Sequence, residues 1–512
     1  MDRFLQTVEE SATYRLLSQL NAGIWELWQG SFIGNAFEAL GAWIRHSFLA
    51  SLFVGRAYAS RSAIAGYLRA RIGAEQELAP SQRWERFLLY FVVVFVPIEL
   101  WLITKLPSEV KYLGDAAVVL LLLSTAIRLN RAGWPLRRTA ADLPVVLLFG
   151  TAVVSTLWNF VPLHIAFFGT RAYLEYYAFY LAIVYIPFAD SERRQLLLWF
   201  LVVAGAIALL GDAQKFLNVA TPRQWLSAAE KATTRAYGTM DNPNTFGGFL
   251  MLTLSVLTAM LFTKVRGGLR VLALAGIAIG LPALLFTLSR EALLAFGAAA
   301  LIIAVISDRR LLLLLVVGLV LLPIVDPHLL TRFTNAFSAG YITTSSTYGR
   351  LLFWSKGLRA FLQSPLIGWG PGRFGGSVAH IYGSPVYVML GLGFNPIIDS
   401  QHVQTLVELG AIGYIAYIWL GVAAVRAGLR LYREELDPFW RAVGLGLAAG
   451  TVGLYIQSFF ASLLETHQVI VVFWLLFGMV VWRLRAVQQR KPVAGRSLAD
   501  ASPAGDPAGD WL

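Results

Sequence analysis

The sequence predicts an all-α, polytopic membrane protein with about twelve transmembrane helices and a large external loop between the ninth and tenth of them. Two observations support this prediction. Hydrophobic residues make up 57% of the 512-residue chain and charged residues only 14%, whereas a soluble domain carries about 25% charged residues. The apolar residues also form uninterrupted blocks long enough to cross a bilayer core of about 30 Å. Because lipid offers no partner for backbone amides, such blocks are expected to be helices.

Charge and cysteine content exclude several classes of protein. The net charge of +12 would suggest a nucleic-acid partner in a soluble protein, but in a membrane protein it reflects arginines at the cytoplasmic ends of spans. The chain has no cysteine, which excludes disulfides, thiol nucleophiles and cysteine-ligated zinc. The first ten residues, MDRFLQTVEE, lack a basic segment followed by an apolar one, so we expect no cleaved signal peptide.

Composition divides the chain into three parts. In residues 1–85, tryptophan and phenylalanine alternate with polar residues and arginines follow, a pattern that predicts amphipathic helices on the cytoplasmic membrane surface. Residues 86–484 form the predicted transmembrane domain. Residues 485–512 are rich in Pro, Gly, Ala and Asp, which predicts a disordered cytoplasmic tail. The predicted spans are 87–104, 113–128, 143–160, 171–188, 195–212, 244–263, 269–288, 291–306, 310–325, 402–425, 441–462 and 468–484.

Arginines in the short loops give the orientation. Positively charged short loops stay in the cytoplasm, and alternate connections are rich in arginine, for example around Arg128, Arg193, Arg309 and Arg426. Both termini are then cytoplasmic. The connections 213–243 and 326–401 are external, and long loops of this kind usually carry function.

A reaction on the external face needs a substrate that is already activated, because no nucleotide pool exists there. A lipid diphosphate is such a substrate, and an enzyme for it needs cations for the phosphates and a base for the acceptor. Arginine suits phosphate geometry. Four arginines stand near the external boundary: Arg171, Arg235, Arg290 and Arg350.

Each of these arginines also has a simpler interpretation. Arg171 precedes Glu175 by one turn, so an i,i+4 ion pair is open as well as a ligand role. Glu291 could neutralise Arg290, and Arg235 could extend to lipid head groups. A predicted helix over 345–362 places Arg350 away from Lys356 and Arg359, so we expect Arg350 to point inward and the other two to face head groups.

His402 is the first candidate for the base. It stands where the large loop enters the tenth span, with Asp399 before it and Glu408 after it, and either carboxylate could orient its ring. A histidine that only hydrogen-bonds at a helix start is the simpler alternative. His467, beside Glu465, is the second candidate.

Two further patterns bear on the chemistry. The glycine-rich run 368–376 resembles a phosphate loop but lacks its Lys-Ser/Thr ending, so a plain external turn is the stronger interpretation. The long loops contain no paired carboxylates, HExxH or DxD motif. The sequence therefore requires neither a metal nor another cofactor.

Several segments, in order, resemble the O-antigen ligase and O-antigen and exopolysaccharide polymerase superfamily of membrane glycosyltransferases. Four features match the motifs of this family. They are an arginine followed by Asn-Pro-Asn, a Ser-Arg pair, an Arg…Trp segment followed by a Pro…Gly-rich one, and a His…Glu-x-Gly segment. These segments are 235–247 (RAYGTMDNPNTFG), 287–293 (TLSREAL), 350–354 (RLLFW) with 364–372 (SPLIGWGPG), and 402–413 (HVQTLVELGAIG). Val403 departs from the family, which has asparagine after the histidine.

The resemblance implies metal-independent transfer of a glycan from undecaprenyl diphosphate to an acceptor hydroxyl. By position, His402 would be the catalytic base, and Arg290 and Arg350 would hold the diphosphate. Residues that match more loosely, or flank these, are candidates for binding substrate: Arg171, Arg235, Asp399, Glu408 and His467.

The resemblance also implies partners and a location. The partners would be the lipid-linked glycan donor, a glycan acceptor, membrane lipids and other polysaccharide-assembly proteins, with no nucleic acid. The site would face the periplasm from a bacterial inner membrane. The chain's length, its N-terminal part and Val403 favour a polymerase over a ligase that transfers to lipid A core or to protein. A twelve-span secondary transporter is the alternative from another class, and its charged residues would lie near the bilayer midplane.

Overall fold

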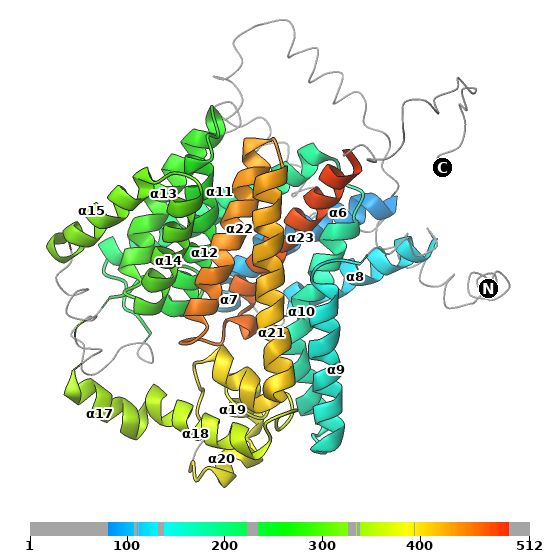
Figure 1. Cartoon of the computed structure of the whole chain (residues 1–512), viewed down its shortest axis with the longest axis vertical. Coiled ribbons are helices and arrows are strands. Elements are labelled where there is room, and N and C mark those ends of the chain that lie inside the picture. Colours follow the sequence, from blue (N-terminus) through cyan, green and yellow to red (C-terminus); the bar gives the residue numbers. More distant parts are fainter. Residues whose placement is uncertain are drawn as a thin grey trace, which may run out of the picture.

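The structure is a computed structural model in which every regular element of the described residues is helical (Figure 1). The described residues are 80–106, 110, 112–131, 138–222, 234–325, 334, 338–393 and 395–490. Almost all of the predicted surface region 1–85 and all of the tail beyond residue 490 therefore lie outside them.

All twelve predicted spans coincide with helices. Among the described residues, eight segments are long and apolar enough to cross a membrane by length and composition, and shorter or more polar helices occupy the other four predicted positions. The prediction of a polytopic helical membrane protein is thereby confirmed. The helices are α6 (Pro80–Phe95), η1 (Val96–Ile98) and α7 (Glu99–Ile103), which together form the first span, then α8 (Leu113–Arg131), α9 (Asp142–Trp158), α10 (Leu163–Tyr185), α11 (Asp190–Phe216), α12 (Pro243–Phe262), α13 (Gly268–Phe286), α14 (Arg290–Ile306), α15 (Arg310–Val325), α21 (Gln401–Glu434), α22 (Pro438–Gln457) and α23 (His467–Arg490).

Two boundaries differ from the prediction. The first described helix, α6, begins at Pro80, so residues 80–85 continue into the first span instead of lying on the membrane surface. The last described helix, α23, continues to Arg490, so residues 485–490 of the predicted tail are helical. Both ends carry polar and basic residues, and helices commonly extend past the apolar block that identifies them.

The centre of the bundle is formed by α12, α22 and α23, whose residues are mostly buried within the protein. Figure 1 shows α13 and α15 on one flank and α8 and α9 on the other. Glycines let the central helices approach closely: a Cβ at Gly428 of α21 would lie 2.4 Å from the carbonyl oxygen of Gly444 in α22. A Cβ at Gly446 would lie 2.7 Å from the Cα of Val256 in α12. Small residues at helix contacts are a common basis of packing in membranes.

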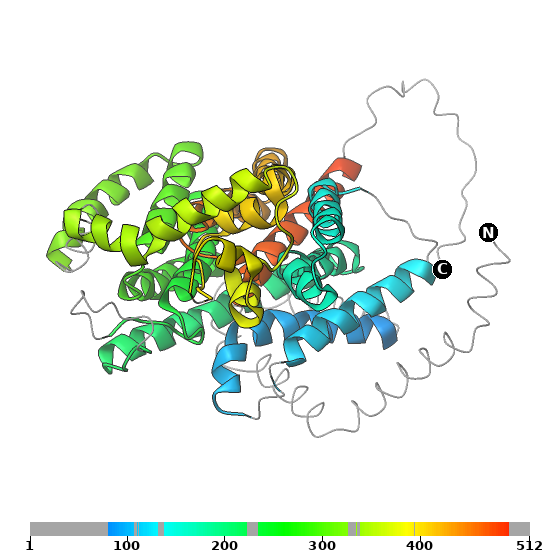
Figure 2. The same ribbon diagram turned by 90° about the horizontal axis from the view of Figure 1, so that it is seen from below.

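The segment between α15 and α21 is largely helical. It contains α17 (Ala339–Tyr348), α18 (Arg350–Gln363), α19 (Gly376–Tyr382) and α20 (Pro385–Met389). Figure 1 places these helices together at one end of the bundle, and Figure 2 shows that end from below. We call it the loop end. The helix predicted over 345–362 begins later, at Arg350, because Gly349 interrupts it and residues 345–348 belong to α17.

Candidate functional site

Helix α21 is broken at Gly410, and this break builds the site. Gly410 has φ +63° and ψ −166°, so two helical arms meet there at an angle. That backbone conformation is essentially restricted to glycine. In a straight helix, residues 402 and 414 would be about 18 Å apart along the axis. Here the His402 ring and the Tyr414 hydroxyl are in hydrogen-bond contact, so the short arm 401–409 folds back toward the long one.

The break is held by the glycine-rich segment that follows α18. Four backbone hydrogen bonds join the two: Ala411 N to the Pro365 oxygen at 2.8 Å, Ile412 N to Leu366 at 3.2 Å, Trp369 N to Val407 at 2.9 Å and Gly370 N to Glu408 at 2.9 Å. A Cβ at Gly368 would lie 2.4 Å from the Glu408 carbonyl carbon. The run predicted to be a plain external turn is therefore a backbone clamp on α21.

His402 is buried, with 4% of its surface exposed. Its Nε2 lies 2.9 Å from the Tyr455 carbonyl oxygen. A carbonyl only accepts hydrogen bonds, so Nε2 carries the proton and Nδ1 has the lone pair. That lone pair accepts from the Tyr414 hydroxyl, 3.0 Å away. The ring stacks on Phe459, with centroids 3.8 Å apart.

The predicted orientation of His402 by Asp399 or Glu408 is wrong. Glu408 instead accepts from the Tyr173 hydroxyl at 2.9 Å and from the backbone N–H of Phe374 at 3.0 Å. The short arm turns the Glu408 side chain toward α10 and the clamp, since it lies six residues, and about 240°, around the helix from His402. Asp399 precedes the arm, and burial raises the pKa of its carboxyl, with Arg350 opposing that effect less strongly.

Arg350 points inward, as predicted. Its Nη2 donates to the Phe460 carbonyl oxygen at 3.1 Å and lies 3.6 Å from a carboxylate oxygen of Glu291. The guanidinium also lies 5.9 Å from the centre of the Phe460 ring. Lys356 does not face head groups as predicted, because its ammonium donates to the Leu390 carbonyl oxygen at 2.6 Å. Arg359 is exposed.

Three helix N-termini meet at the segment 457–461, and a fourth lies beside one of them. Gln457 donates to the Asn244 carbonyl in the first turn of α12, and the Gln401 N–H of α21 donates to the Ser458 carbonyl, both at 2.9 Å. Arg350 begins α18 and donates to the Phe460 carbonyl, and the first turn of α14 lies beside it through Glu291. Arg290 is the first residue of α14, after the N-cap Ser289, and is half-buried. Helix N-termini carry partial positive charge and favour anions.

Arg235 is buried and holds two helix ends together. Its side chain is 7% exposed, and it donates to the Thr287 carbonyl at 2.8 Å and to the side-chain oxygen of Asn244 at 2.9 Å. It therefore links the start of α12 to the end of α13 instead of extending to lipid. The Arg-x-x-Gly and Asn-Pro-Asn parts of its motif are joined by this contact.

Arg171 and His467 lie in a different cluster, formed by α8, α10 and α23. Arg171 bonds Glu175 through two nitrogens at 3.0 and 3.1 Å, which is the i,i+4 pair left open by the sequence, and it also contacts Asp115 at 2.6 Å. His467 Nε2 lies 3.5 Å from Glu175. Asp115, Glu175 and His467 have the spacing of a metal site, but the guanidinium of Arg171 already bridges the two carboxylates.

Glu465, the sequence neighbour of His467, points away from it. Glu465 accepts from the backbone N–H of Ser377 at 2.9 Å and from its hydroxyl at 3.2 Å, and it also accepts from Gln404. The 3₁₀ turn η4 (Leu463–Glu465) directs Glu465 toward α19, whereas His467 begins α23.

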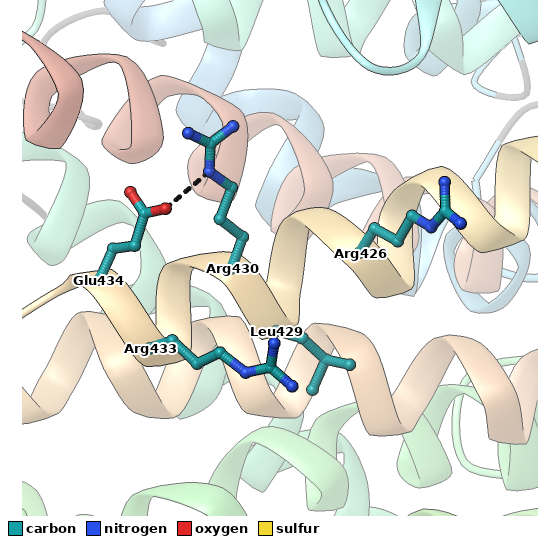
Figure 3. A pocket seen from close by; sticks show the side chains of 5 residues that line it. All are labelled: Arg426, Leu429, Arg430, Arg433 and Glu434. Atoms are coloured by element: carbon teal, nitrogen blue, oxygen red, sulfur yellow. Dashed lines mark hydrogen bonds and ion pairs between the residues drawn. The ribbon is translucent and has the colours of Figure 1, made fainter.

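A hollow lies at the opposite end of α21, far along the helix from His402. It is lined by Arg426, Leu429, Arg430, Arg433 and Glu434, and Arg430 bonds Glu434 at 2.9 Å (Figure 3). These arginines belong to the predicted cytoplasmic charges, where they suit anionic lipid head groups. The hollow does not contribute to the site at the loop end.

The sequence did not identify Tyr414, Tyr455, Phe459 and Phe460 as site residues. Each is aromatic in an apolar span or at its end, where aromatic residues are common. Their proximity to His402 or Arg350 depends on the break at Gly410 and on the turn after α22. The glycine after Glu408-Leu409 was the one local signal that a break could exist.

Residues 275–418 match a family model described as O-antigen ligase. The match contains Arg290, Arg350 and His402 and ends in the long arm of α21. It confirms the resemblance to the O-antigen ligase and polymerase superfamily. A comparison with curated proteins found no match to the chain.

Proposed function

From the O-antigen ligase match over the site segments, we propose that the protein polymerises a surface polysaccharide, an O-antigen or exopolysaccharide. The reaction transfers a glycan from undecaprenyl diphosphate to a hydroxyl of a second lipid-linked repeat unit. The observation that carries the proposal is that Arg350 and His402 both contact the segment 457–461, while Arg290 begins the helix whose Glu291 lies 3.6 Å from Arg350. In the other described cluster that joins an arginine to a base candidate, that of Arg171 and His467, the arginine is already paired with Asp115 and Glu175.

Arg290 and Arg350 bind the donor diphosphate in this scheme. Glu291 is the one carboxylate with an ion pair to Arg350 among the described residues, at 3.6 Å, and the guanidinium otherwise contacts a carbonyl and an aromatic ring. The N-termini of α12, α14 and α18 add partial positive charge. The cations stabilise charge that develops on the leaving diphosphate, so the scheme assigns that role to no metal.

His402 supplies the base. Its Nδ1 has the lone pair, and the Tyr455 carbonyl fixes that tautomer. Neutral imidazole accepts a proton readily near pH 7. Phe459 joins the two halves of the site, since it stacks on His402 and is followed by Phe460, the partner of Arg350.

The site faces the periplasm from the inner membrane in this proposal. Single cysteines test the orientation, because the chain has none of its own. Ser338→Cys and Ser377→Cys, both at exposed positions of the loop end, should react with a membrane-impermeant maleimide in spheroplasts, and Ala132→Cys should not. If Ala132→Cys alone were labelled, the orientation would be the opposite of the one proposed.

A ligase is the second candidate, favoured by the description of the matching family. Val403, which departs from the family pattern, does not decide between them by contact with the site. Val403 packs against Gly357 of α18, where an added Cβ would lie 2.4 Å from the Val403 Cγ1. It also packs against the apolar cluster around Phe374.

One assay with the purified full-length protein in detergent separates these functions. The wild type receives an undecaprenyl-diphosphate-linked repeat, either alone or with lipid A core, without an ion gradient. Extension of the repeat alone supports the polymerase, and transfer only to lipid A core supports the ligase. If neither acceptor is glycosylated while proteoliposomes show gradient-driven uptake, the protein is a transporter and the proposal is wrong.

A further inference from the structure

Both ring nitrogens of His402 are occupied by the protein itself. Nε2 donates to the Tyr455 carbonyl, and Nδ1 accepts from the Tyr414 hydroxyl. Phe459 covers a face of the ring at 3.8 Å, and the rings of Tyr417 and Tyr455 lie 5.4 and 6.2 Å away. With 4% of its surface exposed, His402 has no nitrogen that an acceptor hydroxyl can reach in this arrangement.

We propose that Tyr414 is a catalytic residue that takes the proton of the acceptor hydroxyl and passes its own proton to Nδ1 of His402. This inference rests on the function proposed above. Tyr414 is suited to the position because its side chain is half-buried, whereas His402 is enclosed. A tyrosine hydroxyl can donate and accept a hydrogen bond at the same time, so it can connect an external hydroxyl to an enclosed base.

The proton transfers balance with the bond changes of the reaction. The acceptor oxygen forms a bond to the anomeric carbon of the donor as the bond from that carbon to the diphosphate oxygen breaks. The acceptor proton moves to the Tyr414 oxygen while the Tyr414 proton moves to Nδ1. The electron pair leaves with the lipid diphosphate, which Arg290 and Arg350 hold. His402 is then imidazolium and returns its proton to water through Tyr414 before the next turnover.

The break at Gly410 makes the relay possible. It brings residues 402 and 414 within 3.0 Å although twelve positions separate them in the chain. The Tyr455 carbonyl holds the other nitrogen protonated, so Nδ1 is the one that receives the proton. For His402 to take the proton of the acceptor hydroxyl directly, the Tyr414 hydroxyl would first have to move away from Nδ1.

Tyr414→Phe tests the relay in the full-length protein, because it removes the hydroxyl and keeps the ring. We expect single-turnover transfer to fall about 10²-fold, within the range that proton transfer contributes, with the KM for the donor unchanged. Tyr417→Phe is the matched comparison. Its ring also packs beside His402, and it should cost much less. Thermal unfolding in detergent checks that both variants are folded.

A proton inventory in mixtures of H₂O and D₂O distinguishes a relay from a structural role. The wild type should give a curved plot, since two protons move in one step, and Tyr414→Phe a linear one. Full activity of Tyr414→Phe with an unchanged plot would overturn the relay while the proposed function stands. Absence of any transfer by the wild type would instead remove the proposed function, which makes the two failures distinguishable.

Discussion

Two groups of arginine and histidine in this protein differ in how their charges are matched. In the α8–α10–α23 cluster, Arg171 bridges Asp115 and Glu175 through contacts of 2.6 to 3.1 Å. In the loop-end site, Arg350 is 3.6 Å from its carboxylate and otherwise contacts a carbonyl and a ring. The first cluster also has Glu99 beside it, 5% exposed and with one oxygen lacking a hydrogen-bond partner among the described residues.

This difference shows why position near the membrane boundary does not identify a phosphate ligand. A phosphate near Arg171 would meet several carboxylates, whose negative charge repels it at short range. Near Arg290 and Arg350 it would meet helix N-termini and fewer carboxylates. From the sequence, Arg290, Arg350 and His402 are catalytic candidates, and Arg171 and His467 are substrate-binding ones. The difference in nearby carboxylates supports the proposal that the diphosphate binds at Arg290 and Arg350.

The largest expected effect separates the two histidines. His402→Ala removes the proposed base and should reduce turnover by about 10²–10⁴-fold, with donor binding kept because the arginines hold the phosphates. His467→Ala alters the other cluster and should cost much less. Turnover and donor binding are measured together. If His467→Ala were inactive and His402→Ala active, the two clusters would have been assigned the wrong roles.

The second largest effect should separate the arginines of the two groups. Arg350→Lys and Arg290→Lys keep the charge but lose the planar pair of donors, so we expect transfer to fall at least about tenfold with normal insertion and purification. Arg171→Lys is the matched control for the same change in the other cluster and should keep most activity. If either Arg350→Lys or Arg290→Lys were fully active, that arginine would be structural.

A side chain at the break in α21 should reduce the stability of the protein strongly. Gly410→Ala adds a Cβ that would lie 2.4 Å from the Leu366 carbonyl carbon and requires a positive φ, so the free energy of unfolding should fall by about 1–3 kcal/mol or more. Gly205→Ala in α11 is the control, since nothing lies within 4 Å of its added Cβ. Thermal unfolding in detergent measures both. Equal midpoints for the two variants would mean that the clamp adapts.

The smallest expected effect is in the Arg171 cluster. Arg171→Met leaves Asp115 and Glu175 without their shared cation, so stability should fall, by about 1–3 kcal/mol, while single-turnover transfer by the folded fraction stays close to the wild type. A loss of donor affinity without a loss of stability would return Arg171 to the substrate site and remove the contrast between the two groups.

The sequence by itself determined the helical membrane fold and supplied the candidates for the site. Apolar blocks specify spans because each block must bury its own backbone polar groups, a constraint that acts within a few turns of chain. The i,i+4 pair of Arg171 and Glu175 was foreseeable for the same local reason. His402, Arg290 and Arg350 were found as candidates from residue type and motif, and the family match covers all three.

The tertiary structure decided which residues meet. The partners of His402 are Tyr414 and Tyr455, beyond the break at Gly410 and on the next helix, and the periodicity of a straight helix would have separated Tyr414 from it. Arg350 meets Glu291 and Phe460, which are 59 and 110 positions away in the chain. Contacts across such separations depend on how helices pack and where a glycine allows the backbone to turn, and no local pattern records that.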